Sequence, residues 1–151
     1  MGGTIVCGVT DSADGRGAAE LGFALGTRLG LRAILVSVVD GVPPGTAESL
    51  TARQRLAGAE RAVESIARDA GDGVEWLVVV GDRADALAQV AAEEGADLIV
   101  LGSRPVGLGG RKLRCTLARE LEAATPVPVL VAPPSTRKRS DHRLAAAAGA
   151  R

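Results

Sequence analysis

Aromatic residues are almost missing from this sequence, which has one Trp, one Phe and no Tyr among 151 residues. Proteins that bind single-stranded nucleic acid need aromatic faces on which the bases stack, so this scarcity argues against that class. The hydrophobic core must consist of Val, Leu, Ile and Ala instead. A chain of this length is sufficient for one domain with a substantial core.

Net charge is also missing, because 18 Lys and Arg balance 18 Asp and Glu. Such a chain has no overall attraction for nucleic acid or for an anionic membrane surface, and we expect neither as a partner. The apolar runs are far shorter than the ~20 residues of a membrane-spanning helix. Residues 1–4 lack the basic start of a signal peptide, so none is expected.

Cysteine and histidine are too few to suggest a metal site or a catalytic triad. Cys7 and Cys115 have no CxxC or metal-ligand spacing, and Cys7 is predicted to be a small core residue of a strand. His142 is the only histidine, and it lies near the end of the chain. We therefore expect no metal, no catalytic residue and no enzyme, in a reduced, cytoplasmic protein.

Five short apolar runs, rich in β-branched residues, recur along the chain. They lack the polar alternation of a half-exposed strand, which is typical of strands covered on both faces of a parallel sheet. These runs span residues 4–9, 33–39, 74–80, 97–102 and 127–132.

Helix-like segments separate the runs, and the alternation predicts an α/β fold. We expect a single doubly wound, Rossmann-like, five-stranded parallel sheet with helices on both faces. Leu29 ends a stripe of apolar residues at helical spacing in the first helix, and Leu50 begins one in the second. The predicted helices span residues 15–30, 46–70, 83–95 and 116–125.

The composition changes after Pro133 and Pro134, where a basic stretch is followed by an Ala-rich one. This part has no large apolar anchors, which favours disorder. We predict one domain over residues 1–134 and a disordered tail over residues 135–151.

Ligands of doubly wound sheets bind at the carboxyl ends of the strands, near the point where the strand order reverses. Thr10 and Asp11 follow the first predicted strand, Asp40 follows the second, and Gly102 ends the fourth. A glycine-rich basic stretch, "GSRPVGLGGRKLRCT", begins at Gly102 and leads to the last predicted helix. This stretch is therefore in the right place to contact a ligand.

The stretch matches neither the dinucleotide fingerprint nor the Walker loop, and two interpretations remain open. In the first interpretation, the amino end of the following helix binds a phosphate. The Thr116 hydroxyl and the positively charged side chain of Arg104 could contact the same phosphate. Alternatively, Thr116 is an ordinary N-cap and the basic residues are solvated. The other basic residues of the stretch are Arg111, Lys112 and Arg114.

The segment "GDRADALAQVAAEEGADLIVLGSR", followed by "ELEAATPVPVLVAPP", resembles the universal stress protein family. The resemblance covers residues 4–133, and it implies the family's five-stranded α/β fold. In members that bind ATP, the motif is Gly, two residues, Gly, nine residues, Gly, then Ser or Thr. Here Gly102 and Thr116 match its ends, whereas Pro105 and Cys115 replace two glycines.

The resemblance implies roles for residues outside this motif as well. Val38 matches the position whose backbone contacts adenine, and "VTD", from Val9 to Asp11, resembles the turn in which an aspartate contacts the nucleotide. Either Thr10 or Asp11 occupies that aspartate position.

The resemblance further implies a homodimer formed through the last strand, at Val129 to Val131. This agrees with the aggregation hazard that an unpaired apolar edge strand would otherwise present. Two functions remain open at this point. The protein is either a stress-response protein that binds ATP or another adenine nucleotide at the carboxyl edge of the sheet, or a nucleotide-free dimeric interaction module.

Overall fold

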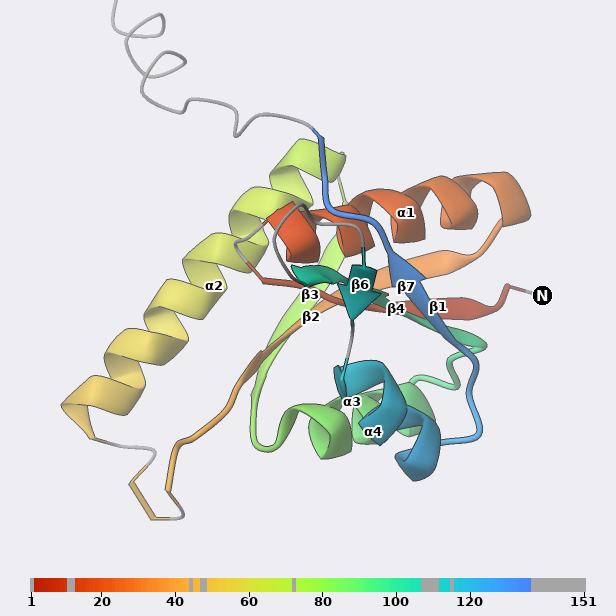
Figure 1. The fold of residues 1–151 in the computed structure, drawn as a ribbon. Helices are drawn as coiled ribbons and strands as arrows, with labels where there is room; N and C mark the ends of the chain where they lie inside the picture. The colour runs from red at the N-terminus through yellow and green to blue at the C-terminus, as the bar shows by residue number, and fades with distance from the viewer. Residues whose placement is uncertain are drawn as a thin grey trace, which may run out of the picture.

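All five predicted strands form one parallel sheet in the computed structural model of the protein (Figure 1). The structure describes residues 2–10, 13–43, 45–46, 49–71, 73–106, 112–114 and 116–136. Asp11, Cys115, His142 and the tail beyond Thr136 lie outside these residues. The strands are β1 (Thr4–Gly8), β2 (Arg32–Val39), β3 (Glu75–Val80), β4 (Leu98–Gly102) and β7 (Val129–Ala132).

The strand order is β3-β2-β1-β4-β7, so the chain builds outward from β1 in one direction and then in the other. The expected doubly wound fold is therefore confirmed. The order reverses between β1 and β4, where Gly8 is paired with Leu101. Because all five strands are parallel, their carboxyl ends meet at one edge of the sheet, on both sides of this reversal.

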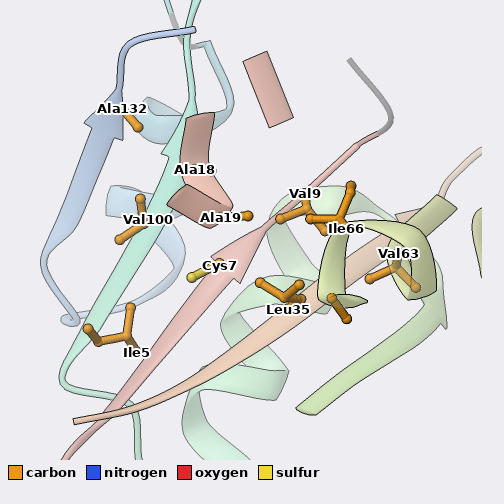
Figure 2. Close-up of a cluster of buried hydrophobic side chains, with 11 residues drawn as sticks. Ile5, Cys7, Val9, Ala18, Ala19, Leu35, Val63, Ile66, Val100 and Ala132 are labelled. Atoms are coloured by element: carbon orange, nitrogen blue, oxygen red, sulfur yellow. The ribbon is translucent and has the colours of Figure 1, made fainter. Parts of the chain in front are cut away.

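Helices cover both faces of the sheet, as Figure 1 shows. Side chains of α1 and α2 pack with β1, β2, β4 and β7 in one cluster, which is centred on Ile5, Cys7 and Leu35 (Figure 2). Side chains of α3 and α4 form a second cluster with Val6, Ile99 and other residues of the opposite face. The helices are α1 (Ala13–Leu29), α2 (Leu50–Ala70), α3 (Arg83–Glu93) and α4 (Thr116–Ala124).

Small residues form most of the inner face of α1, and Ala18, Leu21 and Leu25 of the predicted apolar stripe pack in or against the core. Ala18 and Gly22 are fully or almost fully enclosed against the sheet, whereas Leu29 is 63% exposed. The placement of Leu29 in the stripe was wrong. The buried face is formed largely by glycine and alanine, whose small side chains give little hydrophobic signal, so the leucines were followed instead. The helix does end where expected, at Gly30, whose φ of 67° is the left-handed conformation of a helix stop.

The second helix begins four residues later than predicted, at Leu50 rather than Thr46. Thr46 closes a turn instead, in which its Oγ1 donates a hydrogen bond to the carbonyl of Pro43 at 2.6 Å. Ser49 caps the helix, because its Oγ accepts a hydrogen bond from the Ala52 N–H at 3.2 Å. Leu50 therefore lies in the first turn and is 74% exposed, outside the buried face of the helix.

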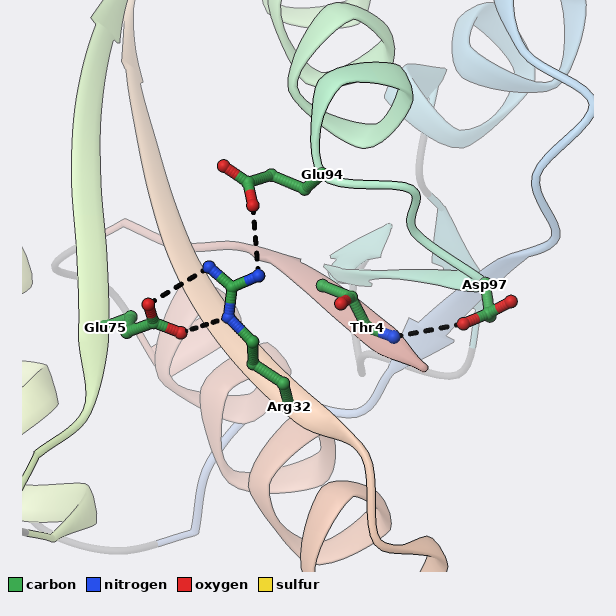
Figure 3. A network of polar contacts seen from close by, with 5 residues as sticks. All are labelled: Thr4, Arg32, Glu75, Glu94 and Asp97. Atoms are coloured by element: carbon green, nitrogen blue, oxygen red, sulfur yellow. Dashed lines mark hydrogen bonds and ion pairs between the residues drawn. The ribbon is translucent and has the colours of Figure 1, made fainter. Parts of the chain in front are cut away.

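Charged side chains tie together the amino edge of the sheet (Figure 3). Arg32, at the start of β2, binds both carboxylate oxygens of Glu75, at the start of β3. Its Nη1 also donates to Glu94, just after α3, at 3.1 Å. Nearby, the backbone of Thr4 donates to an Asp97 carboxylate oxygen at 3.0 Å. These contacts fix the edge opposite to the expected ligand site.

Candidate functional site

The carboxyl edge between β1 and β4 is the candidate site, and the backbone of Val38 points into it. Val36 accepts a hydrogen bond from the Val9 N–H at 2.9 Å, so the Val36 carbonyl faces β1. Val39 accepts from Gly81 at 3.1 Å on the other side, toward β3. Backbone groups of a strand alternate in direction, so Val38 faces the β1 side, as Val36 does.

The strand β2 continues beyond the end of β1, so the backbone groups of Val38 that face the β1 side have no residue of β1 opposite them. The last pair between the two strands joins Gly8 to Val36, whereas β2 runs on to Val39. The Val38 backbone therefore faces the space past the end of β1, at the point where the strand order reverses. This is the position at which the family resemblance implied a backbone contact with adenine.

The turn after β1 brings Thr10 to the same edge, whereas the side chain of Val9 lies in the core. Val9 is 2% exposed and packs with the α1 and α2 cluster, so only its backbone can reach a ligand. Thr10 is exposed and lies against the first turns of α1. A Cβ at Gly15 would overlap the backbone of Thr10. Glycine at position 15 therefore permits the close approach of this turn to the helix.

On the other side of the reversal, Gly102 ends β4 and is paired with Ala132. Ser103, which the sequence did not single out, fixes the chain immediately after it. Ser103 is fully buried, and both its N–H and its Oγ donate to the Ala132 carbonyl, at 3.1 and 2.8 Å. This double contact holds the exit of β4 in place. The sequence feature that could have identified Ser103 is a serine directly after a buried strand.

The stretch after Ser103 begins and ends as paired strands, although the sequence suggested a glycine-rich loop throughout. The strand β5 (Arg104–Val106) pairs antiparallel with β6 (Lys112–Arg114). Pro105 lies opposite Leu113 in this pair. Proline is tolerated in a two-stranded ribbon where its missing N–H can face away from the partner strand. These two strands were not predictable from the sequence, because three residues that include a proline are too few to show the alternation of a β-strand.

Thr116 begins α4, which follows this hairpin and covers the α3 side of the sheet. It is exposed and is the first helical residue, rather than the residue before the helix that the N-cap interpretation required. The first N–H groups of a helix have no partner within the helix. Thr116 thus lies beside the donors that suit a phosphate.

An ion-pair cluster around Asp40 lies at the same edge of the sheet, at the end of β2. The Asp40 carboxylate is 3.0 Å from Arg83 Nε and 3.7 Å from Arg55 Nη2. Arg55 also donates to the Asp40 carbonyl at 2.6 Å. The sequence placed Asp40 at this edge but missed both arginines. The position of Arg83 at the start of α3 was a usable signal, whereas Arg55 was not predictable from the misplaced start of α2.

The described residues were also compared with the requirements of a metal site and of a membrane-spanning helix. No three His, Cys, Asp or Glu side chains gather there in a way that could hold a metal ion. None of the helices described is both long and apolar enough to cross a membrane.

Comparison with known proteins identifies the family. The model of the universal stress protein family matches residues 1–133. This chain belongs to the universal stress protein family. A universal stress protein from Thermus aquaticus, encoded in the 3' region of a QAH/OAS sulfhydrylase, is 30% identical over 132 residues, which cover 85% of this chain and 96% of the relative.

Solved structures of universal stress proteins and similar chains confirm the fold. The protein MJ0577 has a TM-score of 0.69 and 24% identity, with 91% of this chain and 97% of that one covered. An Arabidopsis thaliana universal stress protein, whose structure has AMP bound, has a TM-score of 0.59 and 18% identity, with 92% and 97% covered.

Proposed function

We propose that this universal stress protein binds an adenine nucleotide, ATP or AMP, at the carboxyl edge of its sheet. The observation that carries the proposal is the direction of the Val38 backbone, which faces the space past β1 between Thr10 and Gly102. An N–H and a carbonyl side by side can pair with the donor and acceptor edge of adenine. The AMP bound to the Arabidopsis relative supports the choice of ligand.

The phosphates would lie toward α4 in this arrangement. Thr116 and the first N–H groups of that helix would contact them, together with the Arg104 side chain and the backbone at Gly102. We expect the phosphates to be bound more weakly than by a motif with three glycines, because Pro105 offers no N–H. We expect the protein to act by binding in the cytoplasm, as a stress-response protein without substrate turnover.

Isothermal titration calorimetry with ATP and AMP, with and without Mg²⁺, tests the proposal. We expect dissociation constants of about 0.1–1 mM, and therefore a rise of the melting temperature at 10 mM nucleotide. Thr116→Ala should weaken binding of ATP more than binding of adenosine. Thr27→Ala is the matched control, since Thr27 is exposed near the end of α1. Absence of both heat and stabilisation at 10 mM would refute nucleotide binding.

The second candidate function is a nucleotide-free dimeric interaction module, and the hairpin favours it. Pairing of β5 with β6 engages backbone groups of the stretch that would otherwise surround the phosphates. The titration separates the two functions, and the double variant Pro105→Gly, Cys115→Gly tests whether these two residues are the obstruction. A gain of affinity shows that these two residues obstruct binding, and unchanged affinity shows that they do not.

We also propose a homodimer formed through β7, under either function. This strand is an edge of the sheet, where Leu130 and Val131 are 39% and 37% exposed. No charged residue occurs from Pro126 to Pro134, so the edge lacks the charges that normally prevent pairing with another chain. A second copy of β7 would cover these side chains.

A further inference from the structure

The carboxyl end of β2 has a neighbouring strand on one side only. Its pairing with β1 stops at Val36, whereas its pairing with β3 continues to Val39, opposite Val80. Val38, whose backbone is the proposed contact for adenine, is therefore supported by β3 alone. Because β3 is itself an edge strand of the sheet, this support opens more easily than that of a central strand. A second restraint is needed to keep the Val38 backbone in one direction.

The ion-pair cluster around Asp40 supplies such a restraint, two residues after Val38. Arg83, the first residue of α3, approaches one carboxylate oxygen of Asp40 to 3.0 Å. Arg55 of α2 lies 3.7 Å from the other oxygen and donates a hydrogen bond to the Asp40 carbonyl at 2.6 Å. Since α2 and α3 pack on opposite faces of the sheet, Asp40 is held from both faces. The contact with the carbonyl restrains the backbone as well as the side chain.

The exposure of this cluster separates its local effect from its effect on the whole fold. The side chains of Asp40, Arg55 and Arg83 are 43–45% exposed. Ion pairs at this exposure contribute little to global stability, because water screens the charges. Two arginines on one carboxylate nevertheless form a network, whose geometry is better defined than that of an isolated pair. We therefore expect the cluster to order the end of β2 and to have little influence on the melting temperature.

We propose that Asp40, Arg55 and Arg83 are positioning residues for recognition of the base by the Val38 backbone. This inference rests on the proposed nucleotide binding. Adenine offers an amino group to the backbone carbonyl and an acceptor nitrogen to the backbone N–H, whereas hypoxanthine offers a carbonyl and an N–H in the same places. A backbone held in one direction pairs with adenine and faces like groups of hypoxanthine. The cluster thus determines selectivity for the base and leaves the contacts with the phosphates unchanged.

The test measures, by calorimetry, the ratio of the dissociation constants of inosine triphosphate (ITP), whose base is hypoxanthine, and ATP. Both nucleotides carry the same phosphates, so a change in the general attraction of charge cancels in this ratio. We expect the full chain to bind ATP about tenfold more tightly than ITP, because mismatched hydrogen-bonding groups are left unpaired. The ratio should fall to about two- to threefold in Asp40→Asn, in Arg55→Gln and in Arg83→Gln.

A double variant shows whether these residues act as one cluster. Asp40→Asn already removes the carboxylate charge on which both arginines converge. Adding Arg83→Gln should therefore lower the ratio no further, because residues of one network are not additive. Additive losses from Asp40 and Arg83 would show that each acts independently, and would overturn the cluster as the positioning device.

Hydrogen exchange distinguishes positioning from a direct contact with the base. The Gly81 N–H donates to the Val39 carbonyl at 3.1 Å, where β2 and β3 end. Without nucleotide, the Gly81 amide hydrogen should exchange about three- to tenfold faster in Asp40→Asn than in the unchanged protein, because the end of β2 opens more often. Lost selectivity with unchanged exchange at Gly81 would overturn the positioning role, since Asp40 would then contact the base itself.

The matched controls are Glu64→Gln and Arg68→Gln, which break an exposed ion pair of α2 at 3.1 Å. Both should keep the tenfold preference for ATP that is expected of the full chain. An unchanged ratio in the three Asp40, Arg55 and Arg83 variants, or an equal loss in the controls, would overturn the inference. So would equal binding of ATP and ITP by the full chain. In these cases nucleotide binding itself stands, whereas a full chain that binds neither nucleotide overturns both proposals.

Discussion

Gly22 of α1 lies directly against the thiol of Cys7 in β1, so closely that a Cβ at position 22 would overlap the sulfur. Both residues are buried, and the contact sets how near the helix approaches the sheet. Glycine in a helix normally costs stability relative to alanine. Here it is required by the space available.

Gly22→Ala should therefore destabilise the protein, although the same change usually stabilises a helix. We expect a loss of about 1–3 kcal/mol in the free energy of unfolding, which is typical of overpacking, measured by urea denaturation. The control is Gly58→Ala in α2, where a Cβ meets nothing within 4 Å, and a gain of about 0.5–1 kcal/mol is expected. If Gly22→Ala also stabilises the protein, the close contact does not exist in solution.

Cys7 should be chemically inert while the protein is folded. Burial raises the pKa of the Cys7 thiol to about 12, and the reactive thiolate is therefore almost absent at neutral pH. In a Cys115→Ser variant, Ellman's reagent should label no thiol in buffer and one thiol in denaturant. Rapid labelling of the folded variant would contradict the burial of Cys7.

The amino edge should lose stability in acid through Glu75. The hydrogen bond from Arg32 lowers the pKa of Glu75 below its ordinary 4.5, against a smaller opposing effect of desolvation. A carboxyl with a lowered folded pKa stabilises the protein above its unfolded pKa and loses this effect as the pH falls through the folded value.

Glu75→Gln should thus lower the melting temperature at pH 7, and the difference from the unchanged protein should shrink as the pH falls below 4.5 and the carboxyl of the folded protein is protonated. Glu122→Gln, on the exposed part of α4, controls for the loss of one charge. A difference that does not shrink as the pH falls below 4.5 would show that Glu75 acts through packing instead of through its charge.

If the protein forms the proposed dimer through β7, the same substitution should have different effects at the two edges of the sheet. Val131→Lys in β7 should yield a monomer, because an edge lysine opposes strand pairing, whereas Val80→Lys in β3 should leave the dimer intact. Both valines are exposed edge residues, at 37% and 42%. Sedimentation velocity measures the oligomeric state of both variants. Dissociation by Val80→Lys alone would show that the interface lies at the β3 edge instead.

Much of the fold was predictable because its signals are local. Each buried strand is a short run of β-branched residues, and Gly30 stops α1 where a left-handed residue is needed. The errors occurred where the signal was weak or ambiguous. Glycine and alanine form the inner face of α1, Ser49 competes with Thr46 for the start of α2, and the three-residue strands of the hairpin show no period.

The candidate site was predictable only in part. The positions of Thr10, Asp40 and Gly102 follow from the rule that ligands bind at the carboxyl ends of parallel strands. The partners of Asp40 did not follow from it, because Arg55 and Arg83 reach it from separate helices. Nor did the role of Ser103, whose partner Ala132 is 29 residues away in the sequence.

The sequence by itself determined the α/β class, the five strands and the edge at which a ligand is expected, since hydrophobic period and chain order are sufficient for these. Only the tertiary structure decided which way the Val38 backbone faces and which helices bring arginines to Asp40. Both depend on where neighbouring strands end and on how closely the helices lie beside them. Such distances between remote segments arise only when the chain is packed.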